Sequence, residues 1–211
     1  MEHSLKIPEP VALARPRGAR RLEAFSPKLA RRVTFFRRAL LDQWILLEAD
    51  PAVITFCERL GYVIVDDERR LADFRVRFSG RHELVILSDE DDESVPDESW
   101  HDLDAAALPI REVVPAEIAA ARAWIDNWQR MLPYIVANRD LPSAALSRAI
   151  ERFLAHPHRL LDVEREFATG DPVLVRTALF GLLHAGKVNA PELRTQPLSL
   201  LTTFLVEGAQ P

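Results

Sequence analysis

Cysteine is nearly absent from the 211-residue chain, which holds Cys57 and no other thiol. A single thiol excludes an internal disulfide and suits a reducing cytoplasm, where we expect the protein to reside. Apolar runs long enough to cross a membrane are also lacking, and the N-terminus has no signal-peptide hydrophobic region, so we expect no membrane partner. A lone cysteine at the end of an expected strand is typical of a small core residue, not of a nucleophile.

Acidic residues are scarce in the first 38 positions, which hold ten Lys and Arg but three Glu. This segment therefore carries a charge of +7 and the remainder −12, within a net charge of −5. A basic arm on an acidic body favours contact with a polyanion such as DNA, and a solvated tail is the alternative. Several prolines and Gly18 predict that residues 1–24 form an extended arm.

Basic residues, in turn, are absent from 89–104, a segment with nine Asp and Glu. The alternating ligands and the glycine of a calcium-binding loop are also missing there. A run of like charges is typical of a solvated loop, which is our interpretation of this segment. Its two large apolar residues, Trp100 and Leu103, could anchor a partner.

Residues 25–138 have the pattern of an α/β domain. Ser26-Pro27 predicts a capped short helix or a turn. A broad apolar stripe over 33–48 predicts a helix that ends at Asp50-Pro51, because the residue before proline disfavours helical geometry. A turn at Ser79-Gly80 joins two of the expected strands. The expected strands are 53–56, 62–65, 74–78, 83–87 and 108–114, followed by a helix over 115–134.

Residues 139–211 predict a separate, mostly helical domain. We expect helices over 143–155, 160–168 and 173–184, and a wing over 188–204, which is the outline of a winged helix-turn-helix. Its third helix would read DNA through Arg176, Thr177 and His184, with Lys187 just beyond the helix end. Because this polar face is small, a winged helix that docks on protein is the slightly favoured alternative.

Motifs in the first domain carry a resemblance to a known family. They are F-x-x-x-x-L-x-D-x-x-x-L-L-E-x-D-P from Phe35 to Pro51, then Ala72-Asp73-Phe74, then the apolar strand 84–88. Their order and spacing resemble TnsA-type endonuclease subunits of heteromeric, Tn-seven-like transposases. The resemblance extends over 25–204. It implies an α/β restriction-endonuclease-like (PD-(D/E)XK) core followed by a small all-α, winged-helix C-terminal domain.

The resemblance also implies four active-site positions. In such nucleases carboxylates hold divalent cations, the metal activates water, and a lysine orients the nucleophile. The helix glutamate falls on Leu40, the first-strand aspartate on Asp73, the second-strand acid on Ile86 and the lysine on Ser88. Because Asp73 alone is retained, we expect no catalytic residue, no metal and no cofactor. The expected protein is an inactivated endonuclease, or pseudo-nuclease.

Asp73 has two interpretations. It could be a relic whose carboxylate caps a turn or meets an arginine such as Arg75. It could instead hold Mg²⁺ in a displaced site with Glu83, Glu58 or Asp42. The relic is favoured, because strand alternation places Glu83 only loosely relative to Asp73.

Three functions remain open. The first is a non-catalytic DNA-associated or scaffolding subunit of a DNA transposition machinery, with DNA and, by resemblance, a transposase catalytic subunit or an ATPase regulator as partners. The second is a metal-dependent endonuclease with a rearranged site, and the third is a winged-helix DNA-binding regulator. The candidate DNA-binding residues are Arg15, Arg17, Arg20, Arg21, Lys28, Arg31, Arg32, Arg37, Arg38, Arg176 and Lys187.

Overall fold

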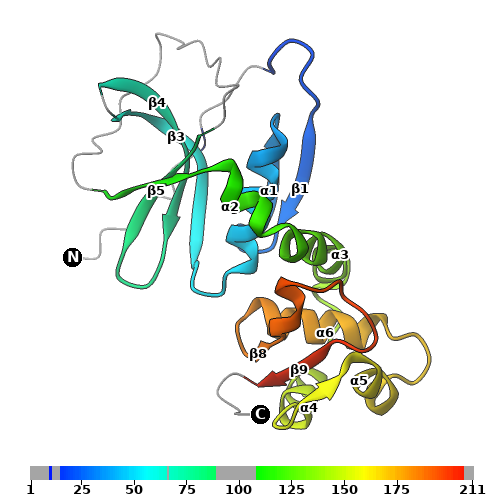
Figure 1. The fold of residues 1–211 in the computed structure, drawn as a ribbon. Helices are drawn as coiled ribbons and strands as arrows, with labels where there is room; N and C mark the ends of the chain where they lie inside the picture. The colour runs from blue at the N-terminus through cyan, green and yellow to red at the C-terminus, as the bar shows by residue number, and fades with distance from the viewer. Residues whose placement is uncertain (1–9, 11–14, 66, 89–107, 207–211) are drawn as a thin grey trace, which may run out of the picture. The chain divides into compact units, whose positions relative to one another are not determined.

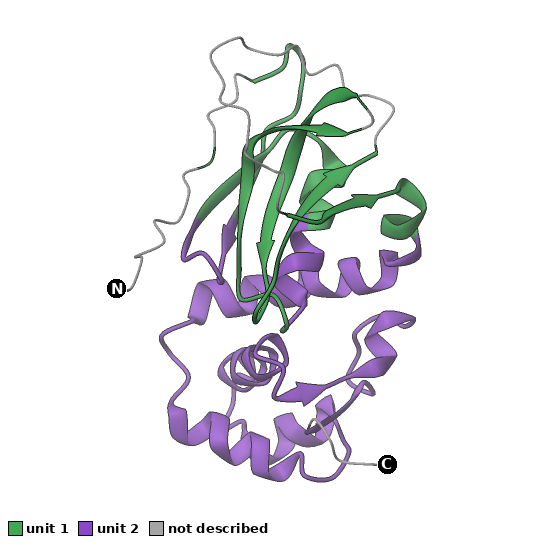
Figure 2. Ribbon diagram, turned by 90° about the vertical axis from the view of Figure 1, so that its left-hand side faces the viewer, with its two compact units in different colours: residues 1–24, 32–43, 52–119 green, residues 25–31, 44–51, 120–211 purple. Residues whose placement is uncertain are grey.

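A computed structural model describes residues 10, 15–65, 67–88 and 108–206, which form two compact units (Figures 1 and 2). Unit 1 comprises residues 1–24, 32–43 and 52–119, and unit 2 comprises 25–31, 44–51 and 120–211. This division differs from the expected consecutive domains 25–138 and 139–211, since it gives 120–138 and two short upstream segments to unit 2. The predicted acidic loop and most of the predicted arm lie outside the described residues.

Unit 1 is built on a four-stranded mixed sheet with the order β3-β4-β5-β6. The pairs β3/β4 and β4/β5 are antiparallel, whereas β5/β6 is parallel. Phe35, Phe56 and Phe74 pack together beside the sheet. The strands are β3 (Thr55–Val65), β4 (Glu68–Arg77), β5 (His82–Leu87) and β6 (Ile110–Val113).

Helix α1 (Arg38–Ala49) precedes this sheet in the chain and ends just before Asp50-Pro51, as predicted. Its start was predicted wrongly. Residues 33–35 belong to strand β2 (Arg31–Phe35), which pairs with β1 (Leu22–Ser26). Ser26-Pro27 opens the turn of this hairpin and not a helix. Val33 and Phe35, two residues apart in β2, are both buried, as alternate residues of a strand on one face are. In the sequence, these two apolar positions adjoin the apolar stripe of α1, so the strand was taken for the first turn of the helix.

Two other sequence predictions are corrected in unit 1 and at its boundary. The expected strands 53–56 and 62–65 form one strand, β3, which is bent by an irregularity between Glu58 and Gly61. Arg59 there has a φ of 51°, so the break in the sequence pattern is a bulge and not a loop. The expected helix 115–134 is split at Ala121 into α2 (Pro115–Ala120) and α3 (Arg122–Asn138). The strand 83–87 and the turn at Ser79-Gly80 are confirmed.

Unit 2 contains α3, α4 (Ala144–Phe153), α5 (Leu160–Phe167) and α6 (Val173–His184), close to the predicted helices. Local signals explain their ends. The Ser143 hydroxyl accepts a hydrogen bond from the backbone N–H of Leu146 at 3.1 Å and caps α4. Gly186 follows α6 with a φ of 70°, which favours glycine. In the described part of the chain, no helix is long and apolar enough to cross a membrane.

A small antiparallel sheet completes unit 2, with the strand order β7-β9-β8 (Figure 1). Its strands are β7 (His158–Arg159), β8 (Val188–Asn189) and β9 (Thr203–Val206), and a 3-10 turn, η1 (Pro191–Arg194), lies between the last two. Within the wing expected over 188–204, the last strand covers only the end, from Thr203. It does not begin earlier because the backbone at Leu200 and Thr202 instead accepts hydrogen bonds from the first residues of α5.

Candidate functional site

Asp73 lies in β4, and its buried carboxylate has donors on both oxygens. Oδ1 accepts a hydrogen bond from Nη2 of Arg37 at 2.9 Å. Oδ2 accepts one from the backbone N–H of Leu87 in β5 at 2.8 Å. The side chain of Asp73 is 3% exposed. The ion pair is with Arg37 and not with Arg75, the arginine that we named from the sequence.

Leu40 and Ile86 stand at the two positions where the resemblance predicts the helix glutamate and the second-strand acid, and both are buried apolar side chains. Their exposed fractions are 9% and 1%. Ile86 packs in one apolar cluster with Val63, Ala72 and Leu84. A carboxylate at position 86 would lose its hydration without gaining a cation, which is strongly unfavourable. The surroundings of Ile86 therefore suit an apolar side chain and not a metal ligand.

Ser88, at the expected lysine position, belongs to a polar network at the end of β5. Its hydroxyl and Nη1 of Arg70 both donate to Oε1 of Glu112 in β6, the arginine at 2.8 Å. These hydrogen bonds, first that from Arg70 and then that from Ser88, lower the pKa of Glu112. Nη2 of Arg70 also lies 3.4 Å from the carbonyl oxygen of Leu87. The cation of this network is therefore Arg70, and position 88 carries a hydroxyl.

The acids considered for a displaced metal site each have an arginine close by. Among the described residues, no group of three or more His, Cys, Asp or Glu side chains is placed to hold a metal ion. A carboxylate that is neutralised by an arginine is a poor ligand for a divalent cation. The pairs are Asp42 with Arg38 at 2.8 Å, Glu58 with Arg59 at 3.9 Å and Glu83 with Arg81 at 3.6 Å.

Many cations of the predicted DNA-binding segment already have partners in the structure. Arg37 and Arg38 pair with Asp73 and Asp42, as described above. Arg31 and Arg32 also make interactions within the protein. Arg17 and Arg20 are exposed. Arg15 donates to the carbonyl of Ala19 at 2.8 Å, and Arg21 pairs with Glu23 at 2.8 Å.

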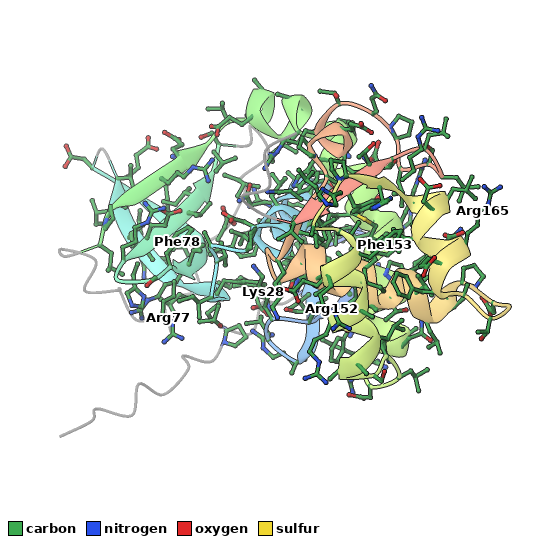
Figure 3. The ribbon with its side chains drawn as sticks, turned by 90° about the horizontal axis from the view of Figure 1, so that it is seen from below. Lys28, Arg77, Phe78, Arg152, Phe153 and Arg165 are labelled. Atoms are coloured by element: carbon green, nitrogen blue, oxygen red, sulfur yellow. The ribbon has the colours of Figure 1, made fainter. Side chains whose placement is uncertain are left out.

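Lys28 has a structural role in unit 2 that the sequence did not reveal. Its Nζ donates hydrogen bonds to the carbonyl oxygens of Leu47, at 2.8 Å, and of Asp50. These carbonyls lie at the C-terminal end of α1, where a cation is favourable. Burial, opposed by the charges of Glu48 and Asp50, lowers the pKa of Lys28 to about 8. Lys28, labelled in Figure 3, therefore caps a helix, and its role as a phosphate contact stays a prediction.

Glu48 is the centre of a buried polar cluster in unit 2. The Ser26 hydroxyl donates to Oε1 of Glu48, and the backbone N–H of Lys28 donates to Oε2 at 3.4 Å. Nε2 of His184, at the end of α6, lies 3.2 Å from Oε2. The ring of Trp128 packs against that of His184. The motif L-L-E-x-D-P thus has a structural explanation, since its glutamate joins the β1–β2 turn, α1 and α6.

Helix α6, expected to read DNA, is largely interior to unit 2. Arg176 donates to Oε1 of Glu164 at 2.6 Å and to the Tyr134 hydroxyl at 3.1 Å, and these hydrogen bonds, the first above all, raise its pKa. Thr177 is buried and donates to the carbonyl of Val173. Lys187 lies 4.0 Å from Glu151. The polar residues named for DNA reading therefore make contacts within unit 2.

The hairpin formed by β4 and β5 carries a set of cations that were not among the candidate DNA-binding residues. Arg75 and Arg77 lie in β4, and Arg81 and His82 lie at the turn and the start of β5. The signal was present as R-V-R-F-S-G-R-H over 75–82. It was overlooked because this segment is short and the chain as a whole is acidic.

A scan of the sequence against protein-family models found no match, and a search of curated proteins found no similar sequence.

Proposed function

We propose that the protein is a pseudo-nuclease: a non-catalytic, DNA-associated or scaffolding subunit of a TnsA-type DNA transposition machinery. The observation that carries this proposal is the state of Asp73. Its two carboxylate oxygens accept hydrogen bonds from Arg37 and from the N–H of Leu87. Leu40 and Ile86, at the positions where the motif of such nucleases has acids, are buried apolar side chains. A divalent cation needs several oxygen ligands, and of these three positions Asp73 alone carries oxygen atoms, which already accept hydrogen bonds.

The order of elements in unit 1 supports a restriction-endonuclease-like core. Helix α1 is followed by three antiparallel strands and by β6, which is parallel to the third of them. In unit 2 the order α4, β7, α5, α6, β8, β9, with the sheet order β7-β9-β8, supports a winged helix. The buried free thiol of Cys57 is compatible with the proposed cytoplasmic location.

The contacts of α6 favour protein docking over base reading as the role of the proposed winged helix. A reading helix presents exposed polar side chains to base edges. Here Arg176 is held by Glu164 and Tyr134, and Thr177 is buried. The partners proposed by resemblance are a transposase catalytic subunit and an ATPase regulator.

A cleavage assay tests the loss of the reaction. The purified protein is incubated with supercoiled plasmid in Mg²⁺ or Mn²⁺, beside the matched variant Asp73→Asn. We expect the same background nicking from both proteins, and no heat of metal binding by calorimetry. Metal-dependent nicking that disappears in Asp73→Asn would overturn the pseudo-nuclease proposal in favour of a rearranged active site.

Co-purification tests the scaffolding role. The tagged protein is expressed together with any transposase or ATPase that its neighbouring genes encode, with DNase treatment to remove bridging DNA. We expect at least one of them to be retained. If the neighbouring genes encode no such proteins, and none binds, the transposition assignment fails. The result of the cleavage assay would not be affected by that failure.

A further inference from the structure

The hairpin of β4 and β5 in unit 1 carries cations on neighbouring positions of one face. Arg75 and Arg77 are two residues apart in β4, so their side chains leave the strand on the same side. His82 in β5 is the register partner of Arg77, and directly opposite residues of an antiparallel pair share a face. Figure 3 labels Arg77 beside Phe78 at the end of this hairpin.

These three side chains have no counter-charge within the part of the chain that the structure describes. None of them takes part in an ion pair there, and buried atoms Nε of Arg77 and Nδ1 of His82 have no hydrogen-bond partner. Asp73, two residues before Arg75 in β4, accepts its hydrogen bonds from Arg37 and from the N–H of Leu87. Glu83 is the register partner of Val76, and so belongs to the opposite face. Buried polar atoms without a hydrogen-bond partner are costly to a fold, and a ligand that brings such partners to this face would offset the cost.

The electrostatics of His82 support the same reading. Burial, and next the positive charges of Arg75 and Arg77, lower the pKa of His82. Among the described residues of this sheet, the charged and titratable groups at alternating positions on its face are these two arginines and Asp73 of β4, together with the buried Cys57 of β3, which is the register partner of Arg75. Like charges on directly opposite strand positions destabilise a sheet. An anion on this face would relieve that repulsion.

The turn of the hairpin adds an aromatic platform. The guanidinium of Arg81 lies 4.1 Å from the ring centroid of Phe78. The side chain of Arg81 is 66% exposed. Aromatic rings and guanidinium planes are the groups on which unpaired bases stack, whereas an acidic peptide needs cations alone. The combination of an arginine face and an aromatic tip therefore favours a polynucleotide over an acidic protein.

We propose that the β4–β5 hairpin binds a polynucleotide, with Arg75, Arg77 and His82 on backbone phosphates and the Phe78–Arg81 tip against a base. The choice of a polynucleotide as the polyanion rests on the proposed function. The site differs from the basic arm and from α6, the two places where the sequence predicted DNA contacts.

Fluorescence polarisation tests the site with labelled single-stranded and duplex 20-mers, on the full-length protein between 50 and 200 mM KCl. We expect Arg75→Gln/Arg77→Gln to weaken binding at least tenfold at 50 mM KCl. The log-log salt slope should become shallower by about 1.4 for single strands and about 1.8 for duplex, since two phosphate contacts are lost. The matched control is Arg130→Gln/Arg148→Gln, which removes two exposed arginines of unit 2 and should change the affinity less than twofold.

Two further variants locate the contact. Phe78→Ala should weaken binding of the single strand at least fivefold and binding of the duplex less, because only unpaired bases can stack on the ring. Arg17→Gln/Arg20→Gln should weaken binding less than the hairpin variant does. If the arm variant abolishes binding while the folded hairpin variant binds like the wild type, the proposal is overturned.

A measurement on the wild-type protein covers the case in which the hairpin variant does not fold. The ring proton of His82 is followed by NMR against pH, with and without the single strand. We expect the oligonucleotide to raise the pKa of His82, and inorganic phosphate at high concentration to compete. An unchanged titration, or polyglutamate that binds the same residues while DNA does not, overturns the proposal. Plasmid nicking would overturn the pseudo-nuclease proposal and leave this phosphate site standing.

Discussion

Replacing Asp73 with asparagine distinguishes a structural carboxylate from an empty metal ligand. Acidic residues gathered for a metal repel one another when it is absent, so losing one usually leaves the free energy of unfolding unchanged or raises it. Asp73 instead accepts hydrogen bonds from Arg37 and from the N–H of Leu87. We therefore expect Asp73→Asn to lower the free energy of unfolding.

The contacts of Asp73 set the size of the effect. A hydrogen bond to a charged group contributes roughly 1.5–3 kcal/mol. The amide of asparagine has one acceptor atom, so it cannot accept from both Arg37 and Leu87, and one buried donor then faces another donor. Because Arg37 is partly exposed, water offsets some of this cost, and we expect a loss of about 2–4 kcal/mol. Arg37→Met should cost at least as much, about 3–4 kcal/mol, because it leaves the buried carboxylate of Asp73 without its cation.

Urea denaturation followed by circular dichroism measures these changes. The double variant Arg37→Met/Asp73→Asn should lose less than the sum of the two single variants, by about 1–2 kcal/mol, because the singles remove the same contact. Asp140→Asn is the control: Asp140 is 86% exposed beside Arg139, so the change should stay within about 0.5 kcal/mol. An Asp73→Asn protein as stable as the wild type would refute this reading of Asp73.

Three further predictions follow from single sites. The pKa of Lys28 is lowered to about 8 in the folded protein, whereas in the unfolded chain Lys28 keeps its proton up to about pH 10.5. Because the unfolded state binds more protons in this range, the free energy of unfolding should rise by about 2–3 kcal/mol between pH 8 and 10.5. Lys28→Met should flatten that rise in urea titrations. Ser143→Ala should cost about 1 kcal/mol in thermal denaturation, because α4 loses its cap. Leu40→Glu/Ile86→Glu/Ser88→Lys should lower stability by several kcal/mol, since the two acids become buried charges. A stable triple variant that cuts DNA would show instead that the site is open.

Local signals in the sequence determined most of the secondary structure. Asp50-Pro51 ended α1, Ser79-Gly80 joined β4 to β5, and Gly186 ended α6. Each of these signals acts through the φ angle or the hydrogen bonds of neighbouring residues, so it needs no knowledge of the rest of the fold. The apolar character of positions 40 and 86, on which the pseudo-nuclease proposal depends, was equally legible in the sequence.

The tertiary structure alone decided what the charged side chains contact. Arg37 meets Asp73 from 36 residues away, and His184 meets Glu48 across 136 residues. Lys28, a basic residue of the predicted DNA-binding set, became the cap of α1. A charged residue has the same local pattern whether it faces solvent, a carboxylate or a helix end. Its role is fixed by which elements pack against it, and that packing depends on burial summed over distant parts of the chain.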